Sequence, residues 1–267
     1  MKFFLYAATF LLIGSAKGQE LFVYTEPASN MAAKSIGIRA KSTFQKSELS
    51  GENVYGLNPE IMWGASKNIM VHADAFFSNK ENKFTATGGS FYMKYRFFSV
   101  DEVHSHFRMA AFGRYSFSNN SITEYATDLF GNNTGYEAGL VGTKLINKLA
   151  LSASGSVFHA LDNGNQKFLY KSRRNGINYT LSAGKLMLPK EYTSYKQTNV
   201  NLMLEFLGQT NLGDGASYID VAPSVQFIFN SRVRIDLGYR YPIVTNLQRD
   251  IAKGALLRLE YNFFNAF

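Results

Sequence analysis

One pattern recurs along most of this chain: stretches of about ten residues in which apolar and polar side chains alternate. The last stretch, residues 257–267, reads LRLEYNFFNAF and has an apolar residue at every second position up to Phe263. Because side chains point alternately to the two faces of a strand, each stretch has one apolar and one polar face. An apolar face needs an apolar layer against it, which is either more protein or lipid.

Twelve such stretches are separated by turn-like sequences. Ten residues in a strand tilted by about 40° cover about 25 Å, the height of the apolar band of a membrane barrel. No stretch suggests the helices or second domain that would cover so many apolar faces in a soluble protein. We therefore predict an all-β fold, a transmembrane up-and-down antiparallel β-barrel. Its expected strands are 35–45, 56–66, 69–78, 87–98, 106–118, 135–146, 149–159, 176–188, 198–208, 218–229, 232–242 and 254–264.

The expected connections differ in length. The turns at 66–68, 146–148 and 230–232 are tight, whereas the loops 118–135 and 160–176 are long and polar. With an even number of strands, the tight turns share one end with both termini, which in outer-membrane barrels faces the periplasm. Two connections on that side, FSVDEVHSH and PKEYTSYKQ, are longer than this rule prefers.

The N-terminus has the features of an export signal. Lys2 precedes the apolar run 3–14, and the small residues Ala16 and Gly18 follow, so we expect a signal peptide over 1–18. Residues 19–34 are then a periplasmic tail or a small plug in the lumen, and the transmembrane barrel spans 35–267 as one domain. The chain has no cysteine, which excludes disulfides and a lipid-anchored N-terminus.

The net charge of the chain limits the kinds of molecule that it is expected to bind. The net charge is +8, and loss of Lys2 and Lys17 with a signal peptide would lower it by two. A moderate basic excess favours contact with anionic lipopolysaccharide or an anionic solute. Nucleic acid is not expected as a partner, because no basic helix, zinc-ligand spacing or RNA-binding signature accompanies the charge.

The C-terminus resembles the terminal signature of Gram-negative outer-membrane β-barrel proteins, a final Phe preceded by aromatic or apolar residues at alternate positions. Tyr261, Phe263 and Phe267 match, whereas Asn265 is polar where an apolar residue is usual. The resemblance implies a place in the cell outer membrane among its lipids and recognition by the barrel-assembly machinery. Tyr261, Phe263 and Phe267 would be the assembly signal. The resemblance does not identify a substrate.

The polar faces carry charges of both signs. Arg or Lys facing mid-bilayer lipid costs about 2–4 kcal/mol, so these residues are predicted to line the lumen. They are Arg39, Lys41, Glu60, Asp74, Lys94, Arg96, Arg108, Arg114, Glu137, Glu205, Asp220, Arg234, Asp236, Arg240, Arg258 and Glu260. They form either a salt-bridge network that fills the lumen or the wall of a pore. We expect a passive channel or transporter for a small polar or anionic solute. The alternative is a plugged, non-conducting structural or adhesive barrel whose loops 118–135 and 160–176 bind an external partner.

A lipid hydrolase ranks third among the functions. Outer-membrane phospholipase A and lipid A deacylase place a His, usually with a Ser, near the outer leaflet. His159 ends the seventh expected strand with Ser154, Ser156 and Asp162 nearby, but the surrounding sequence matches neither family's motif. A histidine at the barrel rim is the simpler interpretation, and no enzyme activity is expected.

No metal or cofactor is expected either. His104 and His106 stand beside Asp101 and Glu102, but no third nitrogen ligand is evident, and a solvated turn explains them. His72 is expected to face the lumen beside Asp74, as a structural partner.

Overall fold

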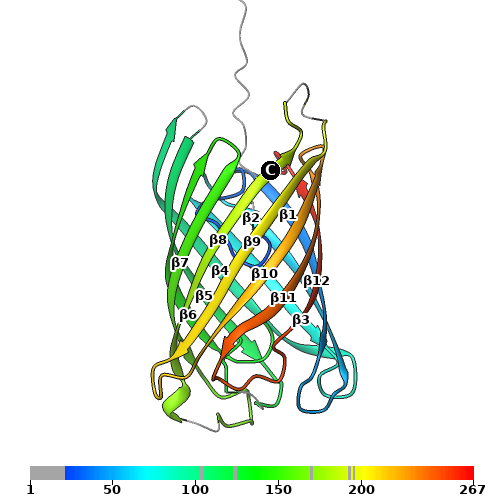
Figure 1. Ribbon diagram of the computed structural model, residues 1–267, viewed down its shortest axis with the longest axis vertical. Coiled ribbons are helices and arrows are strands. Elements are labelled where there is room, and N and C mark those ends of the chain that lie inside the picture. Colours follow the sequence, from blue (N-terminus) through cyan, green and yellow to red (C-terminus); the bar gives the residue numbers. More distant parts are fainter. Residues whose placement is uncertain (1–21, 103–104, 123–124, 169–170, 192–193, 195) are drawn as a thin grey trace, which may run out of the picture.

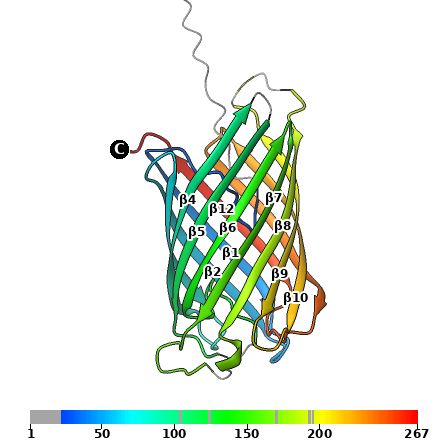
Figure 2. The same ribbon diagram turned by 90° about the vertical axis from the view of Figure 1, so that its left-hand side faces the viewer.

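The computed structural model describes residues 22–102, 105–122, 125–168, 171–191, 194 and 196–267; the expected signal peptide lies outside them. Twelve antiparallel strands form a closed barrel in which each strand pairs with its sequence neighbours and β1 pairs with β12 (Figures 1 and 2). The strands are β1 (Ser35–Lys46), β2 (Asn53–Gly64), β3 (Ile69–Ser78), β4 (Thr85–Glu102), β5 (Ser105–Ser118), β6 (Gly135–Ile146), β7 (Leu149–Ala160), β8 (Asn175–Leu188), β9 (Asn199–Asn211), β10 (Ser217–Phe229), β11 (Val233–Thr245) and β12 (Gly254–Phe263). The predicted fold class and strand number are confirmed.

The two faces of the wall differ as the alternation predicts. Ile38, Leu140 and Leu259 are about half exposed on the outside, whereas Glu205 and Asp220 are fully buried inside. The barrel therefore has a polar interior and an apolar outer surface, the reverse of a soluble protein. Within the described residues, no helix is long and apolar enough to cross a membrane.

Some of the predicted boundaries were wrong by three or four residues; β9 and β11, for example, each end three residues later than expected. The stretch FSVDEVHSH was expected as a connection, but β4 extends to Glu102 and β5 starts at Ser105, with residues 103–104 outside the description. Cross-strand pairing explains the extension, because Val100 pairs with Phe107 and the rings of Phe98 and Phe107 lie 5.9 Å apart. The second strand begins at Asn53, three residues earlier than expected.

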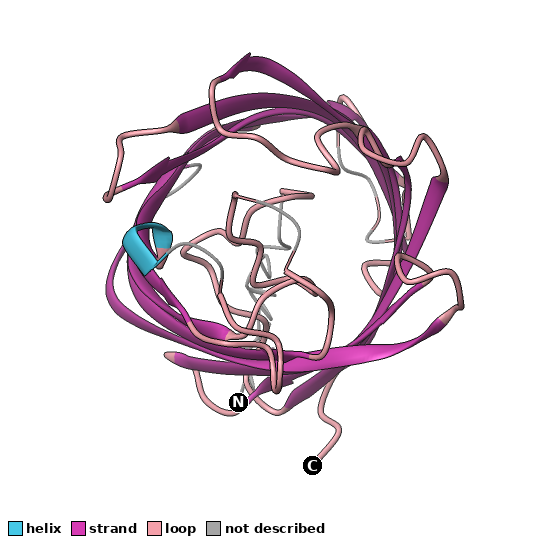
Figure 3. Cartoon of the chain, turned by 90° about the horizontal axis from the view of Figure 1, so that it is seen from below, coloured by secondary structure: helices cyan, strands magenta, loops and turns pink. Residues whose placement is uncertain are grey.

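The barrel has two unlike ends. The terminal end, at the top of Figure 1, carries the start of β1 and the end of β12, and the loop end carries the connections 119–134 and 161–174. Residues 22–34, here called the N-terminal segment, lie inside the barrel. Part of the 119–134 connection also turns inward, and Figure 3 shows loops crossing the interior when the barrel is viewed from the loop end. Both segments thus reach the middle of the lumen from opposite ends.

The outer face supports a first prediction. Leu259 lies midway along β12 and is 47% exposed, so Leu259→Arg places a charge against the hydrocarbon and should destabilise the barrel by about 2–4 kcal/mol. Leu212→Arg, just beyond the end of β9, is the matched control and should cost less than about 1 kcal/mol. Urea unfolding in lipid vesicles measures both. Equal losses at the two positions would contradict the assignment of this face to lipid.

Candidate functional site

A single carboxylate holds the start of the N-terminal segment. Glu205 on β9 accepts hydrogen bonds from the backbone N–H groups of Val23 (2.9 Å), Tyr24 (3.0 Å) and Thr25 (2.9 Å), and from the Thr25 hydroxyl (2.7 Å). These are charge-assisted bonds, which are stronger than neutral ones. Glu205 therefore binds three consecutive N–H groups of one peptide chain.

Two arginines bind the carbonyl groups beside this contact. Arg234 donates to the Phe22 carbonyl (2.7 Å), and Arg258 donates to the carbonyls of Phe22 (2.8 Å) and Val23 (2.9 Å). Asp236 accepts from both guanidinium groups, at 3.0 Å from Arg234 Nε and 2.5 Å from Arg258 Nε. The aspartate thereby orients two cations toward the same backbone.

The second half of the segment is held in a similar way. Lys94 on β4 is fully buried and donates to the carbonyls of Pro27 (2.7 Å) and Ser29 (2.9 Å). Arg39 on β1 donates to Glu26 at 3.0 Å. Charges that the sequence predicted as a lumen wall thus bind the segment that passes along it.

Arg39 also connects the segment to the wall. The same guanidinium lies 3.0 Å from a carboxylate oxygen of each of Glu60 on β2 and Glu260 on β12. Three carboxylates around one arginine form a network that joins neighbouring strands to the segment.

Apolar contacts complete the fit. Phe22 and Val23 are buried in a cluster with Ala150, Met203 and Leu256. Gly238 on β11 lets the segment approach closely, because a Cβ atom there would lie 2.8 Å from the Tyr24 ring.

The histidine expected beside Asp74 has another partner. His72 Nδ1 pairs with Glu60, whereas Asp74 accepts from Ser90 (2.5 Å) and lies 3.7 Å from Arg114. His72 is buried inside the barrel on the same face of β3 as Asp74, as expected. Each of the two side chains bonds to a different neighbouring strand.

The 119–134 connection enters the lumen from the loop end. Thr127 exchanges two backbone hydrogen bonds with the Gln209 side chain on β9, at 3.0 and 2.8 Å. The Phe130 ring lies under Arg114 (4.0 Å from the guanidinium carbon) and Lys41 (4.9 Å from Nζ). Residues 126–130 are therefore built into the lumen, not displayed to an external partner.

A side chain from another loop supports this inward fold. Glu81, between β3 and β4, accepts the backbone N–H of Ser121 at 2.6 Å. This hydrogen bond favours the ionised carboxylate and holds the pKa of Glu81 below its usual value.

The connection between β11 and β12 contributes a further cation. Arg249 makes two hydrogen bonds to Asp220 on β10, at 2.6 and 2.7 Å, and Arg240 makes another at 2.5 Å. Arg249 also lies over the Tyr218 ring, 3.8 Å from its centroid. One aspartate therefore faces two guanidinium groups.

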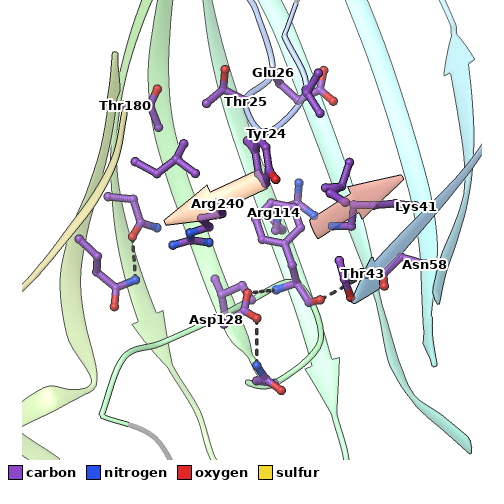
Figure 4. A pocket seen from close by; sticks show the side chains of 18 of the residues that line it. Tyr24, Thr25, Glu26, Lys41, Thr43, Asn58, Arg114, Asp128, Thr180 and Arg240 are labelled. Carbon is purple, nitrogen blue, oxygen red and sulfur yellow. Dashed lines mark hydrogen bonds between the residues drawn. The ribbon is translucent and has the colours of Figure 1, made fainter. Parts of the chain in front are cut away.

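A cavity of about 340 Å³ remains between the N-terminal segment and the inward loops (Figure 4). Lys41 on β1, Arg114 on β5 and Arg240 on β11 face it, together with hydroxyl and amide side chains of β7 and β8. The Lys41 side chain lies over the Phe130 ring and makes no hydrogen bond or ion pair to the described part of the chain. Glu137 accepts hydrogen bonds from Ser156 and from Asn178 (2.9 Å), and no cation pairs with it among the described residues. The cavity thus has an unpaired cation on β1 and an unpaired carboxylate on β6.

The structure distributes the predicted lumen residues over three places. Those that contact or support the N-terminal segment are Arg39, Lys94, Arg108, Glu205, Arg234, Asp236, Arg258 and Glu260. Those at the cavity or paired with its lining are Lys41, Glu60, Asp74, Arg114, Glu137, Asp220 and Arg240. Arg96 lies at the terminal end and donates to the Lys67 carbonyl at 2.7 Å. Thr127, Phe130 and Arg249 were missed, because they lie in loops where alternation carries no information.

The residues considered for lipid hydrolysis do not come together. His159 faces outward, stacks on Tyr136 with 5.2 Å between ring centroids, and contacts Asn175 at 2.7 Å. Ser154 and Ser156 lie on the opposite face of β7, lining the cavity. A serine and a histidine on opposite faces of a strand cannot exchange a proton.

The histidines considered for a metal do not form a site in the described part of the chain. His104 lies outside the described residues, and His106 lies 3.8 Å from Asp101. The described residues contain no group of three or more His, Cys, Asp or Glu side chains that could hold a metal ion.

Comparisons with known proteins agree with this architecture. No protein-family model matches the chain, and no curated protein is similar to it in sequence. The structure is similar to the COG4313 outer membrane channel from Pseudomonas putida F1, with a TM-score of 0.58 and 10% identity over 91% of this chain and 100% of the other. OccK5 of Pseudomonas aeruginosa (TM-score 0.41, 11% identity, 83% and 62% coverage) and Salmonella typhi OmpF (0.36, 8%, 86% and 96%) are likenesses too weak to support an argument.

The fold and the structural similarity to a known channel together define the class of protein. The protein is a closed twelve-stranded antiparallel β-barrel with the fold of the COG4313 outer membrane channel, the architecture that the C-terminal signature implied. Two segments enter its lumen, one from each end.

Proposed function

We propose that this protein is an outer-membrane channel for small polar or anionic solutes, closed at rest by its own N-terminal segment. The observation that carries the proposal is the cavity of about 340 Å³ in the middle of the lumen, with Lys41 and Arg240 facing it. Membrane lipid and lipopolysaccharide would contact the apolar outer face. A solute would move through the polar interior once the segment is displaced.

Unpaired polar atoms support a solute path over a purely structural lumen. Tyr24 Oη, Thr127 Oγ1, Arg114 Nε and Arg249 Nε are buried and have no hydrogen-bond partner within the described residues. Each buried polar atom without a partner costs about 1–3 kcal/mol. A lumen selected only for stability would pair such atoms internally, whereas a rearrangement that displaces the segment would expose them to water or a polar solute.

The competing function is a permanently plugged structural barrel. The many hydrogen bonds to the N-terminal segment favour it, and the inward position of residues 126–130 weakens its adhesive form. Recordings in planar bilayers separate the two. A chain beginning at Gln19 should conduct rarely, and a chain beginning at Lys34, which lacks the segment, should show stepwise conductance in most insertions. Silence of both chains at both polarities, with folding verified by circular dichroism, would support the plugged barrel.

The same recordings test the solute class. In the chain beginning at Lys34, replacing Lys41 and Arg240 with Gln should lower the preference for anions over cations, because these cations face the cavity. Lys253→Gln, an exposed loop position 45% accessible to solvent, is the matched control and should leave the preference unchanged. A preference insensitive to Lys41 and Arg240 would remove them from the solute path.

The assembly signal remains a proposal with its own test. The rings of Tyr261 and Phe263 lie 4.6 Å apart, and Phe267 contacts Trp63 at 6.1 Å, all toward the terminal end of the outer face. We expect Phe267→Asn to reduce the folded fraction in the outer membrane several-fold, because it removes the residue that the assembly machinery would recognise. Asn132→Ala, in a loop, is the control. Heat-modifiable migration on gels reports the folded fraction, and equal folding of the two variants would reject the signal.

A further inference from the structure

We propose that the lumen is a binding site for short peptides that adopt the bent backbone of residues 23–25, and that residues 22–30 occupy this site as an internal substitute for them. The inference rests on the proposed channel function and names its substrate class. It follows from the kind of contact that the wall makes, from the groups that the segment would leave behind, and from the adjoining cavity.

The wall recognises main chain more than side chains. Glu205 takes three consecutive N–H groups, and Arg234, Arg258 and Lys94 take the carbonyls of residues 22, 23, 27 and 29. The Thr143 hydroxyl accepts the next free N–H, that of Ala28, at 2.9 Å. Any peptide without proline at the corresponding positions offers the same donors and acceptors.

Side chains of the segment contribute fewer contacts. Thr25, Glu26 and Ser29 are the members of residues 22–30 whose side chains bond to charged groups of the wall. Phe22 and Val23 lie against Ala150, Met203 and Leu256, a set that would accept other apolar side chains of similar size. The site should therefore accept peptides of different sequence. A lumen evolved to hold only its own segment would not need this tolerance.

If the N-terminal segment left the lumen, a specific set of hydrogen-bonding groups on the wall would lose their partners. Glu205 has no ion pair within the described residues, so its buried charge is balanced by the N–H groups of the segment. A buried carboxylate without hydrogen bonds is costly. Another peptide restores the three N–H donors and the carbonyl acceptors together, which a sugar or an inorganic anion does not.

The cavity provides room and a place for peptide termini. It adjoins Val23–Glu26, has a volume of about 340 Å³, and carries the unpaired Lys41 on β1 and the unpaired Glu137 on β6. These strands lie on nearly opposite sides of the barrel. A zwitterionic peptide has a carboxylate for Lys41 and an ammonium group for Glu137.

Binding of a synthetic peptide tests the inference. The peptide FVYTEPASN, the sequence of residues 22–30, is titrated by calorimetry into the detergent-solubilised chain that begins at Lys34. We expect saturable binding, at least tenfold weaker to the chain beginning at Gln19, whose own segment occupies the site. N-methylation of the peptide at the Val, Tyr and Thr nitrogens removes the donors to Glu205 and should weaken binding at least tenfold.

Further experiments test whether the site binds peptides of other sequence and whether Glu205 is responsible for the binding. A peptide with Phe and Val exchanged for Leu and Ala, and Glu for Gln, should bind within about fivefold; loss of binding would overturn the claim of general peptide recognition. Glu205→Gln should weaken binding at least tenfold, and the exposed Glu48→Gln should not. If the short chain does not fold, a full-length chain carrying Thr25→Ala and Glu26→Gln, which loosens the segment, replaces it.

The outcomes separate this inference from the channel function. A short chain that conducts but binds no peptide overturns the inference and leaves the channel. A short chain that binds peptide but never conducts overturns the channel function and leaves the binding site.

Discussion

Oxidation of a Thr25→Cys/Ser182→Cys variant is expected to abolish conductance, and reduction is expected to restore it. The two hydroxyl oxygens lie 3.0 Å apart, one on the N-terminal segment and one on β8, a spacing compatible with a disulfide. The natural chain has no cysteine, so the introduced pair is unambiguous. Locking the segment to the wall should reduce the open fraction in planar bilayers to below about a tenth of the reduced value, because the segment must leave for solute to pass.

The matched control is Ser154→Cys/Thr180→Cys. These hydroxyls lie 2.6 Å apart on β7 and β8, so the disulfide joins two strands of the wall without touching the segment. Oxidation of the control should leave the open fraction nearly unchanged, because the segment stays free to leave. If the locked segment conducts as well as the reduced one, the segment is not the gate.

Glu205→Gln is expected to open the channel. The substitution exchanges charge-assisted hydrogen bonds, worth about 1.5–3 kcal/mol each, for neutral ones worth about 0.5–1.5 kcal/mol, so the closed state loses at least about 1–2 kcal/mol. Since 1.4 kcal/mol is tenfold in an equilibrium, the open-to-closed ratio should rise by about five- to thirtyfold. Single-channel dwell times in the chain beginning at Gln19 measure this ratio.

Glu137→Gln isolates the contribution of the segment. Glu137 is another buried carboxylate of the lumen, but its hydrogen bonds come from Ser156 and Asn178 on the wall. Its replacement removes the same charge without loosening the segment, and the open-to-closed ratio should stay within about threefold. A rise of equal size in both variants would mean that lumen charge, not the Glu205 contacts, sets the closed state.

The sequence alone determined the wall of this protein. Period-two alternation is a local property, readable from each strand without knowledge of its neighbours, and it assigned Leu259 to the outside and Arg258 to the inside. The number of strands and the fold class followed from the repetition of that pattern. The prediction that the sheet closes into a barrel followed from the same pattern. Boundaries were less certain where pairing with a neighbour extended a strand, as in β4.

Only the tertiary structure decided what the inward charges do. Arg234 and Arg258 share Asp236 and together bind the Phe22 carbonyl, more than 200 residues earlier in the chain. The contact depends on strand register and on the path of a segment without periodicity, and neither is encoded locally. The same holds for Phe130, placed under Arg114 by an inward loop. Alternation specifies which face a side chain takes, but a closed barrel brings twelve such faces together, and their pairing across the lumen is a property of the whole fold.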